Sequence, residues 1–500
     1  MRQVAARRAA TVAVAAAVAS LTTGAALAHD GGVARVTNAN DAGPGSLRAA
    51  IERASADPSI RRIELRPRLA PIALAQPVAF TGAQSLAIDG NGATIDGGAL
   101  DPAAEHAILV SGGGDLTVTW LTVRDAPQQG LTYEVPAAAT GVKRVVLHGV
   151  EVLGNGGHGV LVDDQVDPED TGNQDGSPAS LDVRVVGSRF ADNGFGALDR
   201  DGLRIDEGGV GTLRATISLS RFEHNGADGV ELDERGLGDA VFRVSGTQIS
   251  RNGSFDVTEA DLDDGMDVDE WGEGALIGTV LASSASDNFE EGWDFNENEA
   301  GDFRVDMALV EASRNREEGV DFEEDDDVQG GGDLVTTLVG LRTEGNGPGG
   351  DAGLKIRERG DGLLRATVRG ARADGNLTGG VNLREQGAGD LAASLSRVVS
   401  TGNGTAGIAL REDDAGSLSG TIDRSTADGN VGDGIDLDEN ADGDLTVTAS
   451  RGSASGNVVG VRADQGGTGV GALQLVAMAL VGNTTAPTVA NPGVTVTETP

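Results

Sequence analysis

A short pattern of apolar and polar residues recurs along the chain. Residues 229–234 read GVELDE, a glycine followed by apolar and acidic residues in alternation. A period of two is typical of a β-strand with one buried face, so the pattern predicts that Val230 and Leu232 point inward and that Glu231 and Asp233 point outward. We find no helical periodicity in these repeats.

The same six-residue pattern occurs eleven times, and its spacing is regular. The first glycines of successive copies are 43, 27, 36, 27, 27, 34, 27, 27, 27 and 26 residues apart, which indicates a 27-residue repeat with insertions. The copies are GVLVDD from 159, GLRIDE from 202, GVELDE from 229, GMDVDE from 265, GWDFNE from 292, GVDFEE from 319, GLKIRE from 353, GVNLRE from 380, GIALRE from 407, GIDLDE from 434 and GVRADQ from 460.

Each unit carries further strand-like segments and an upstream asparagine. A segment that begins Gly-Asp-Leu or similar, such as GDLTVTA from 443, follows the acidic pattern. A stretch of small residues, such as SRGSAS from 450, comes next. Gly, Asn and Asp separate these segments and favour turns, so each unit predicts three short strands. The recurrent asparagines are Asn155, Asn193, Asn225, Asn252, Asn288, Asn315, Asn346, Asn376, Asn403, Asn430 and Asn457.

One unit is too small to bury its apolar face alone, whereas stacked units bury a continuous core. The repeat therefore predicts an all-β parallel β-helix with three strands per rung. A β-sandwich rarely repeats at constant length, and a propeller blade runs to about 40 residues or more.

A 27-residue rung with a recurrent turn asparagine resembles the right-handed parallel β-helices of the pectin-lyase-like superfamily. Residues 36–51, VTNANDAGPGSLRAAI, resemble the N-terminal Gly-Ser-Leu-Arg segment of many secreted β-helix repeat proteins. The resemblance implies a short capping helix at about Leu47 to Ala54. It implies the fold but not the function, because many functions share this fold.

The chain is predicted to divide into four segments. Its start carries three arginines, an Ala/Val-rich stretch and the small-residue ending Ala26-Leu27-Ala28, a pattern typical of a secretory signal peptide. We therefore expect a secreted or extracellular protein without a transmembrane segment, with cell-surface association left open. The segments are 1–28 as the signal peptide, 29–150 as the N-terminal cap and first irregular rungs, 151–482 as the regular repeats, and 483–500 as a C-terminal cap or tail.

Charge and cysteine content narrow the choice of partners. The formal net charge is −40, which disfavours nucleic acid and anionic membranes and favours cations or basic partners. The chain contains no cysteine, so disulfides cannot stabilise it. We expect a monomer, with an extracellular polysaccharide or a cationic partner as the candidates for binding.

The sixth position of the pattern forms an acidic column. Stacked strands lie about 4.8 Å apart, and two like charges at that distance repel by about 0.9 kcal/mol in water and by more near a protein surface. Cations, shared protons or hydrogen bonds from turn amides could relieve this repulsion, and the sequence leaves open whether the carboxylates turn inward or face solvent. The column comprises Asp164, Glu207, Glu234, Glu270, Glu297, Glu324, Glu358, Glu385, Glu412, Glu439 and Gln465.

Further acids flank this column on the rungs between about 206 and 324, where no basic column accompanies them. Such a dense acidic face favours hard divalent cations with oxygen ligands, of which calcium is the expected one outside the cell. The alternative is that the acids only stabilise turns and keep the protein soluble. The candidate metal ligands are Asp206, Glu207, Glu231, Asp233, Glu234, Asp267, Asp269, Glu270, Asp294, Glu297, Asp321, Glu323 and Glu324.

The insertions fall in the turns that flank this strand, where projecting loops could wall in its face. In the late repeats Arg357, Arg384 and Arg411 precede the Glu column and would neutralise it. A lyase-like reaction would need an Arg or Lys base beside a cation-bound acidic cluster, and Lys355 and Arg357 are the candidates for that role. The inserted stretches are DQVDPEDTGNQDGSP from 164, FGALDRD from 195, SFDVTEADLDD from 254 and DDDVQGGG from 325.

Other motifs add little. Residues 438–443 fit the start of a calcium loop, but Ala449 stands where a bidentate Glu should fall. His158 lies in a Gly-His-Gly that occupies an ordinary turn slot. Trp293 is expected in the core together with Phe295 and Phe322, and Trp271 is expected to be exposed beside the acidic face.

Three functional hypotheses follow from the sequence. The first is a non-enzymatic secreted β-helix whose acidic face binds calcium or a cationic partner. The second is a polysaccharide lyase or glycoside hydrolase that acts in the walled acidic face. The third is a structural spacer.

Overall fold

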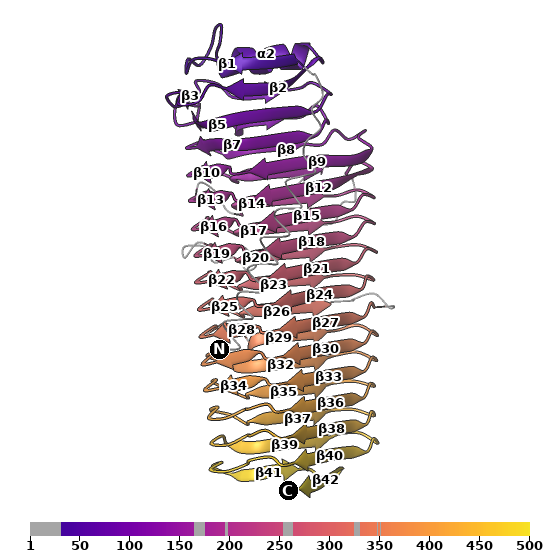
Figure 1. Cartoon of the computed structure of the whole chain (residues 1–500). Coiled ribbons are helices and arrows are strands. Elements are labelled where there is room, and N and C mark those ends of the chain that lie inside the picture. The colour runs from indigo at the N-terminus through magenta and orange to yellow at the C-terminus, as the bar shows by residue number, and fades with distance from the viewer. Residues whose placement is uncertain are drawn as a thin grey trace.

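The computed structural model describes residues 32–164, 176–195, 199–253, 264–324, 331–347, 349–350 and 352–500. The predicted signal peptide and most of the four inserted stretches lie outside these residues. The described chain winds into a tall column in which the strands of successive rungs stack in register (Figure 1). The predicted parallel β-helix with a capping helix is confirmed.

The helix α2 (Leu47–Ala56) closes the N-terminal end of the column. Ser46 caps it, because its hydroxyl accepts a hydrogen bond from the backbone N–H of Ala49 at 3.2 Å. One face of the helix, which includes Leu47 and Ile51, is buried against the first strands. The helix predicted at about Leu47 to Ala54 is confirmed.

The first rungs are less regular than the rest. β5 pairs with β7 across a register shift between Asp89 and Ala93. These early strands are β1 (Gly32–Val36), β2 (Ile60–Leu65), β3 (Ile72–Ala73), β5 (Leu86–Asp96) and β7 (Leu116–Arg124).

One side of the regular coil is a column of long strands in which each strand pairs in parallel with the next. Its members are β9 (Gly141–His148), β12 (Ala179–Val186), β15 (Leu213–Ser218), β18 (Ala240–Ser245), β21 (Leu276–Leu281), β24 (Phe303–Ala308), β27 (Leu334–Val339), β30 (Leu364–Arg369), β33 (Leu391–Ser396), β36 (Leu418–Asp423), β38 (Leu445–Ser450), β40 (Gly471–Val476) and β42 (Val494–Thr499).

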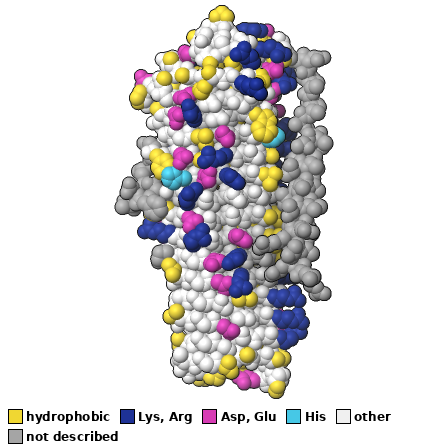
Figure 2. Space-filling model, turned by 60° about the vertical axis from the view of Figure 1, so that its left-hand side comes forward, with side chains coloured by type: hydrophobic (Ala, Val, Ile, Leu, Met, Phe, Trp, Pro, Cys, Tyr) yellow, Lys and Arg dark blue, Asp and Glu magenta, His cyan; other side chains and the backbone are white. Residues whose placement is uncertain are grey.

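A column of three-residue strands forms the second side. Figure 2 turns this side forward and shows Lys and Arg side chains interspersed with Asp and Glu side chains. The strands are β10 (Glu151–Leu153), β13 (Arg189–Ala191), β16 (Arg221–Glu223), β19 (Gln248–Ser250), β22 (Ser284–Ser286), β25 (Glu311–Ser313), β28 (Arg342–Glu344), β31 (Arg372–Asp374) and β34 (Val399–Thr401).

The repeated acidic pattern forms the third side, a separate parallel sheet called here the third strand column. Its register pairs each sixth-position residue with that of the next rung, from Asp164 with Glu207 to Glu439 with Gln465. The strands are β4 (Val78–Phe80), β6 (His106–Val110), β8 (Gln129–Glu134), β11 (Val160–Asp164), β14 (Leu203–Glu207), β17 (Val230–Glu234), β20 (Met266–Glu270), β23 (Trp293–Glu297), β26 (Val320–Glu324), β29 (Ala352–Glu358), β32 (Gly379–Glu385), β35 (Ile408–Glu412), β37 (Ile435–Glu439), β39 (Val459–Gln465) and β41 (Ala486–Ala490).

Apolar side chains from all three sides fill the interior of the coil. Val230 and Leu232 are fully buried, as the alternation predicts. Trp293 is also buried, and the rings of Phe295 and Phe322 stack with their centroids 5.5 Å apart. Trp271 is 44% exposed. Each of these predictions about the core is confirmed.

A buried ladder of asparagines runs along one corner of the coil. The backbone N–H and the side-chain amide of Asn225 both donate to the side-chain oxygen of Asn252, at 3.1 and 2.9 Å. The same pair of bonds joins Asn155 to Asn193 across an insertion. From Asn155 to Asn457, the ladder gives partners to buried polar groups at this corner of the coil.

The last strands continue the coil. β41 pairs with β39 and β42 pairs with β40. Among the described residues, no helix has the length and apolar character that crossing a membrane requires.

Candidate cation site on the third strand column

The recurrent glutamates lie on the inner side of the coil. Alternation places Val230, Leu232 and Glu234 on the same side of β17, and Glu234 is fully buried. The carboxylates accept hydrogen bonds from turn amides; that of Glu358, for example, accepts from Gly360 at 2.9 Å and from Gly362 at 3.2 Å. These side chains therefore stabilise the turns that follow the third strand column.

Burial and neighbouring carboxylates shift the pKa values within this ladder upward. Burial, followed by hydrogen bonds with the neighbouring glutamates, raises the pKa of Glu234 to about 12, and that of Glu385 to about 11. Burial also raises the pKa of Glu270, while hydrogen bonds from Glu234 and Glu297 oppose that rise. Raised pKa values of this kind favour the sharing of protons between neighbouring glutamates.

The predicted metal ligands fall into two sets, according to whether their side chains point into the coil or out of it. Glu207, Glu234, Glu270, Glu297 and Glu324 are fully buried at the turns. The other eight occupy the opposite, outer side of the strands and form the outer face of the third strand column. These eight are Asp206, Glu231, Asp233, Asp267, Asp269, Asp294, Asp321 and Glu323.

Arg204 neutralises one end of this outer face. Its guanidinium lies 2.9 Å from Asp206, 2.8 Å from Glu231 and 2.8 Å from Asp233. Burial disfavours its charged form, but these carboxylates more than offset burial and hold the pKa of Arg204 well above its ordinary value. Arg235 adds a second contact to Asp233 at 2.7 Å.

No basic column accompanies these acids, but a single basic residue, Arg204, pairs with them at this end. Arg204 occupies the outward position that is acidic in the next four copies of the pattern, from Glu231 to Asp321. An arginine at a position where the next four copies carry an acid was the feature of the sequence that could have predicted this ion network.

Lys355 and Arg357 neutralise the other end. The Lys355 ammonium lies 2.6 Å from Asp321 and 2.6 Å from Glu323, and Arg357 also contacts Glu323. Burial opposes the charge on Lys355, but the nearby carboxylates raise its pKa above the ordinary value. A lysine held protonated in this way is poorly suited to act as a base.

Between these ends, three acids converge. Asp264, Asp267 and Asp294 each offer a carboxylate oxygen, and these oxygens lie within 4.8 Å of one another. The residues are 2%, 7% and 9% exposed, so their charges are largely removed from water. Hard oxygen donors at this separation fit calcium, and we call this group the Asp264 cluster.

Asp264 belongs to an acidic column that the sequence analysis missed. Asp201, Asp228, Asp264, Glu291 and Glu318 each stand directly before the first glycine of a copy. Backbone N–H groups donate to the carboxylate of the previous rung, as from Asp228 to Asp201 at 3.0 Å and from Glu291 to Asp264 at 2.6 Å. The recurrence of an acid before that glycine could have revealed the column.

The neighbourhood of the Asp264 cluster carries excess negative charge. Burial, together with the charges of Asp264, Asp294 and Asp321, raises the pKa of Glu291 well above its ordinary value. The oxygens of Asp264, Glu290 and Glu291 also approach one another within 4.8 Å. Cations, shared protons and hydrogen bonds can each relieve such a concentration of carboxylates, and the backbone N–H of Glu291 already donates to Asp264.

The described part of the same face also contains a shallow hollow of about 430 Å³ on later rungs, lined in part by Asn382, Ala409, Arg411 and Asp436. It lies beyond the rungs that the sequence singled out. The loops predicted to wall in the acidic face are mostly outside the described residues.

No protein-family model and no curated protein matches the chain, whereas several solved structures show a similar fold. Pectate lyase Pel9A is 15% identical over 69% of this chain and 80% of its own, with a TM-score of 0.39. The periplasmic alginate epimerase AlgG is 13% identical over 78% and 75%, with a TM-score of 0.40. The A-module of the Azotobacter vinelandii mannuronan C-5 epimerase AlgE6 is 15% identical over 89% and 94%, with a TM-score of 0.33. Similarities this low indicate no function.

Proposed function

We propose that this protein is an extracellular, non-enzymatic β-helix that binds calcium at the Asp264 cluster. The observation that carries the proposal is the convergence of three buried carboxylates, from Asp264, Asp267 and Asp294, within 4.8 Å. Asp267 and Asp294 face outward from neighbouring paired strands, and Asp264 approaches from the turn before β20.

The separation of the oxygens suits one shared ion. Calcium binds oxygen at about 2.3–2.6 Å, so two of its ligand atoms lie at most about 5 Å apart. Calcium takes six to eight oxygens, and carboxylates that bind through both oxygens, together with water, would complete the shell.

The charges at the two ends of the face support this location. Arg204 binds the acids of β14 and β17, and Lys355 binds those of β26. The raised pKa of Lys355 is also our reason for preferring cation binding to a lyase reaction that would use this lysine as the base.

Calcium titration with thermal unfolding tests this proposal. A ligand that binds only the folded state stabilises it by about 2.7 kcal/mol at a concentration of 100 Kd, so calcium should raise the Tm of the wild-type protein. Asp267→Asn should remove most of that rise, because it takes one carboxylate out of the Asp264 cluster.

Asp436→Asn is the matched control. Asp436 occupies the same strand position on β37 and is 8% exposed, but it lies 3.1 Å from Arg411. This variant should keep the calcium response. No shift of the wild-type Tm at millimolar calcium, or an equal loss of response in both variants, would contradict the proposal.

A further inference from the structure

Trp120 is an unusual residue at its position in the coil. It has a backbone φ of +51° and is 57% exposed. Other non-glycine residues, such as Leu219 and Leu309, also have positive φ at this turn, so the distinguishing feature of Trp120 is its exposed indole, which forgoes burial. The register of β7, β9 and β12 places Gly149 and Gly187 at the same turn on the next two rungs. Both glycines also have positive φ.

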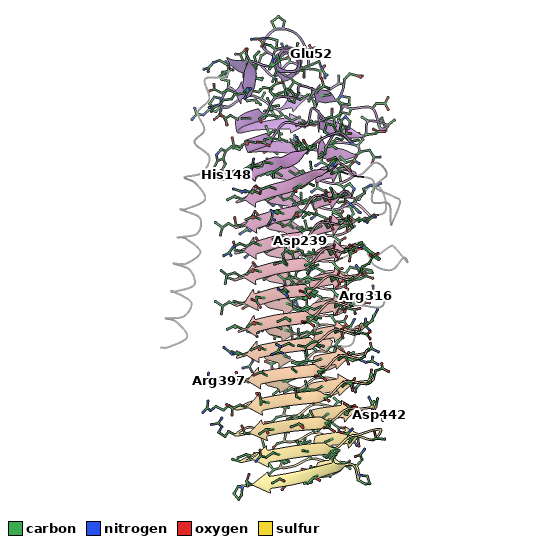
Figure 3. All side chains as sticks on the ribbon, turned by 90° about the vertical axis from the view of Figure 1, so that its right-hand side faces the viewer. Glu52, His148, Asp239, Arg316, Arg397 and Asp442 are labelled. Atoms are coloured by element: carbon green, nitrogen blue, oxygen red, sulfur yellow. The ribbon has the colours of Figure 1, made fainter. Side chains whose placement is uncertain are left out.

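The indole lies against the coil on one side. A Cβ atom added to Gly149 would come within 2.5 Å of an indole carbon, so the ring covers this glycine. The imidazole of His148 packs beside the indole, with the ring centroids 5.2 Å apart and the planes tilted by 46°. Figure 3 shows His148 at the edge of the coil, where this turn column runs. The position of Trp120 is thus fixed while much of its surface faces solvent.

A hollow of about 480 Å³ extends from Trp120 along this edge. Its volume lies within the range of about 300–1,000 Å³ that is common for ligand sites. Gly92 and Gly187 line the hollow without side chains, Gly149 lies under the indole, and Leu219 lies at the far end. Nothing lies within 4 Å of a Cβ atom added to Gly187, so the space beside the indole is open.

Polar side chains line one flank of the hollow. Thr122 donates to Glu151 at 3.3 Å, and Arg189 donates to Glu223 at 2.6 Å. Arg221 also lines the hollow and is exposed, and it forms no ion pair with any other residue that the structure describes. In a chain of net charge −40, this guanidinium offers a local site for an anion.

We propose that the hollow between Trp120 and Leu219 binds one ring of an acidic saccharide. The C–H face of the pyranose would lie on the indole, its carboxylate would face Arg221, and its hydroxyl groups would meet Thr122 and Glu151. An aromatic surface combined with a few convergent polar groups suits a ligand that has one apolar face and polar edges. The hollow lies between the long and short strands, away from the Asp264 cluster.

Calorimetric titration with two oligosaccharides tests this inference. Tetragalacturonate is the acidic probe and cellotetraose the neutral probe, both with EDTA present so that calcium binding is not measured. The wild-type protein should bind the acidic probe about tenfold more tightly or better, the ratio that 1.4 kcal/mol of extra interaction gives. Failure to bind either probe, or equal affinity for both, would overturn the proposal without bearing on the calcium site.

Trp120→Gly removes the aromatic surface and installs the residue that this turn uses on the next two rungs, so folding should be preserved. We expect it to weaken tetragalacturonate binding about tenfold or more. Trp120→Phe should retain most of the affinity. Trp271→Ala, which alters the exposed tryptophan of the third strand column, should leave binding unchanged. Unchanged binding by the Trp120→Gly protein would contradict the proposed site.

Arg221→Gln tests the anion contact. It should abolish the preference for tetragalacturonate over cellotetraose while the weak affinity for the neutral probe persists. Arg342→Gln is the control, because Arg342 occupies the same position on β28 and pairs with Glu344. A preserved preference in the Arg221 variant would overturn the assignment of an acidic ligand.

Discussion

Arg204 holds the carboxylates of Asp206, Glu231 and Asp233 on the outer face of β14 and β17. The arginine and these acids are all less than 10% exposed. A buried ion network adds little net stability compared with an apolar replacement, but the removal of one partner leaves uncompensated charge in a poorly solvated place. The positive charge of Arg204 is therefore needed to keep the surrounding carboxylates buried without a large loss of stability.

We expect Arg204→Met to destabilise the protein by about 3–5 kcal/mol at pH 7, which is the usual cost of breaking a buried pair. Urea unfolding followed by circular dichroism measures the change. Acidification should recover part of the loss, since protonation neutralises the three acids.

Arg304→Met provides the comparison for this variant. Arg304 contacts Asp302 on the surface, where its side chain is 58% exposed. An exposed pair contributes little, so this variant should unfold near the wild-type urea midpoint. Similar losses for the two variants would contradict a special role for Arg204.

At the scale of the elements, the alternation of apolar and acidic residues predicted the third strand column and its pairing. A period of two assigns each side chain to one face, so the inward position of Val230 follows directly. The same rule places Glu234 inward, but the sequence alone did not show whether the strand continues that far before the turn. The hollow at Trp120 was not predictable from the repeat, because Gly149 and Gly187 follow at irregular spacings of 29 and 38 residues.

We predict that the loss of an asparagine from the interior of the ladder destabilises the protein. Asn315→Ala removes the oxygen that accepts the backbone and side-chain N–H groups of Asn288, at 3.2 and 3.0 Å. Each buried donor left unpaired costs about 1–3 kcal/mol, so the urea midpoint should fall clearly.

Asn483→Ala alters the last member of the ladder and is the matched control. Within the described chain, Asn483 accepts the backbone N–H of Asn457 but not its side-chain amide, and it is partly exposed, so water can replace much of the loss. We expect a smaller destabilisation than for Asn315→Ala. The reverse order would show that the ladder does not determine the stability of the interior rungs.

At the scale of the whole molecule, the inward glutamates link stability to pH. Burial and neighbouring glutamates raise the pKa of Glu412 to about 8, that of Glu297 to about 10 and that of Glu385 to about 11. Above the ordinary pKa of about 4.3, the unfolded chain has lost these protons while the folded chain retains them. The folded state therefore binds more protons, and its stability falls as pH rises.

We predict that the Tm is highest near pH 4–5 and decreases from there through pH 8 and above, as differential scanning calorimetry in matched buffers would measure. Glu385→Gln mimics the protonated side chain and should raise the Tm at pH 8 more than at pH 5. Gln465 is the natural precedent, since its side-chain amide donates to the carbonyl oxygen of Gly443 at 2.8 Å. Glu344→Gln, an exposed surface change, should leave the pH profile unaltered. A Tm that rises steadily from pH 5 to pH 8 would contradict this prediction.

The bond that joins Asn155 to Asn193 spans 38 residues, and the bond that joins Asn225 to Asn252 spans 27, yet their lengths are 2.8 and 2.9 Å. Extra chain that enters at a turn leaves the spacing of the coil unchanged. The corners of this molecule are thus natural points of attachment for foreign peptides. A displayed epitope or affinity tag placed there would be presented at a defined height along a rigid rod, and several could be arranged at intervals set by the rungs.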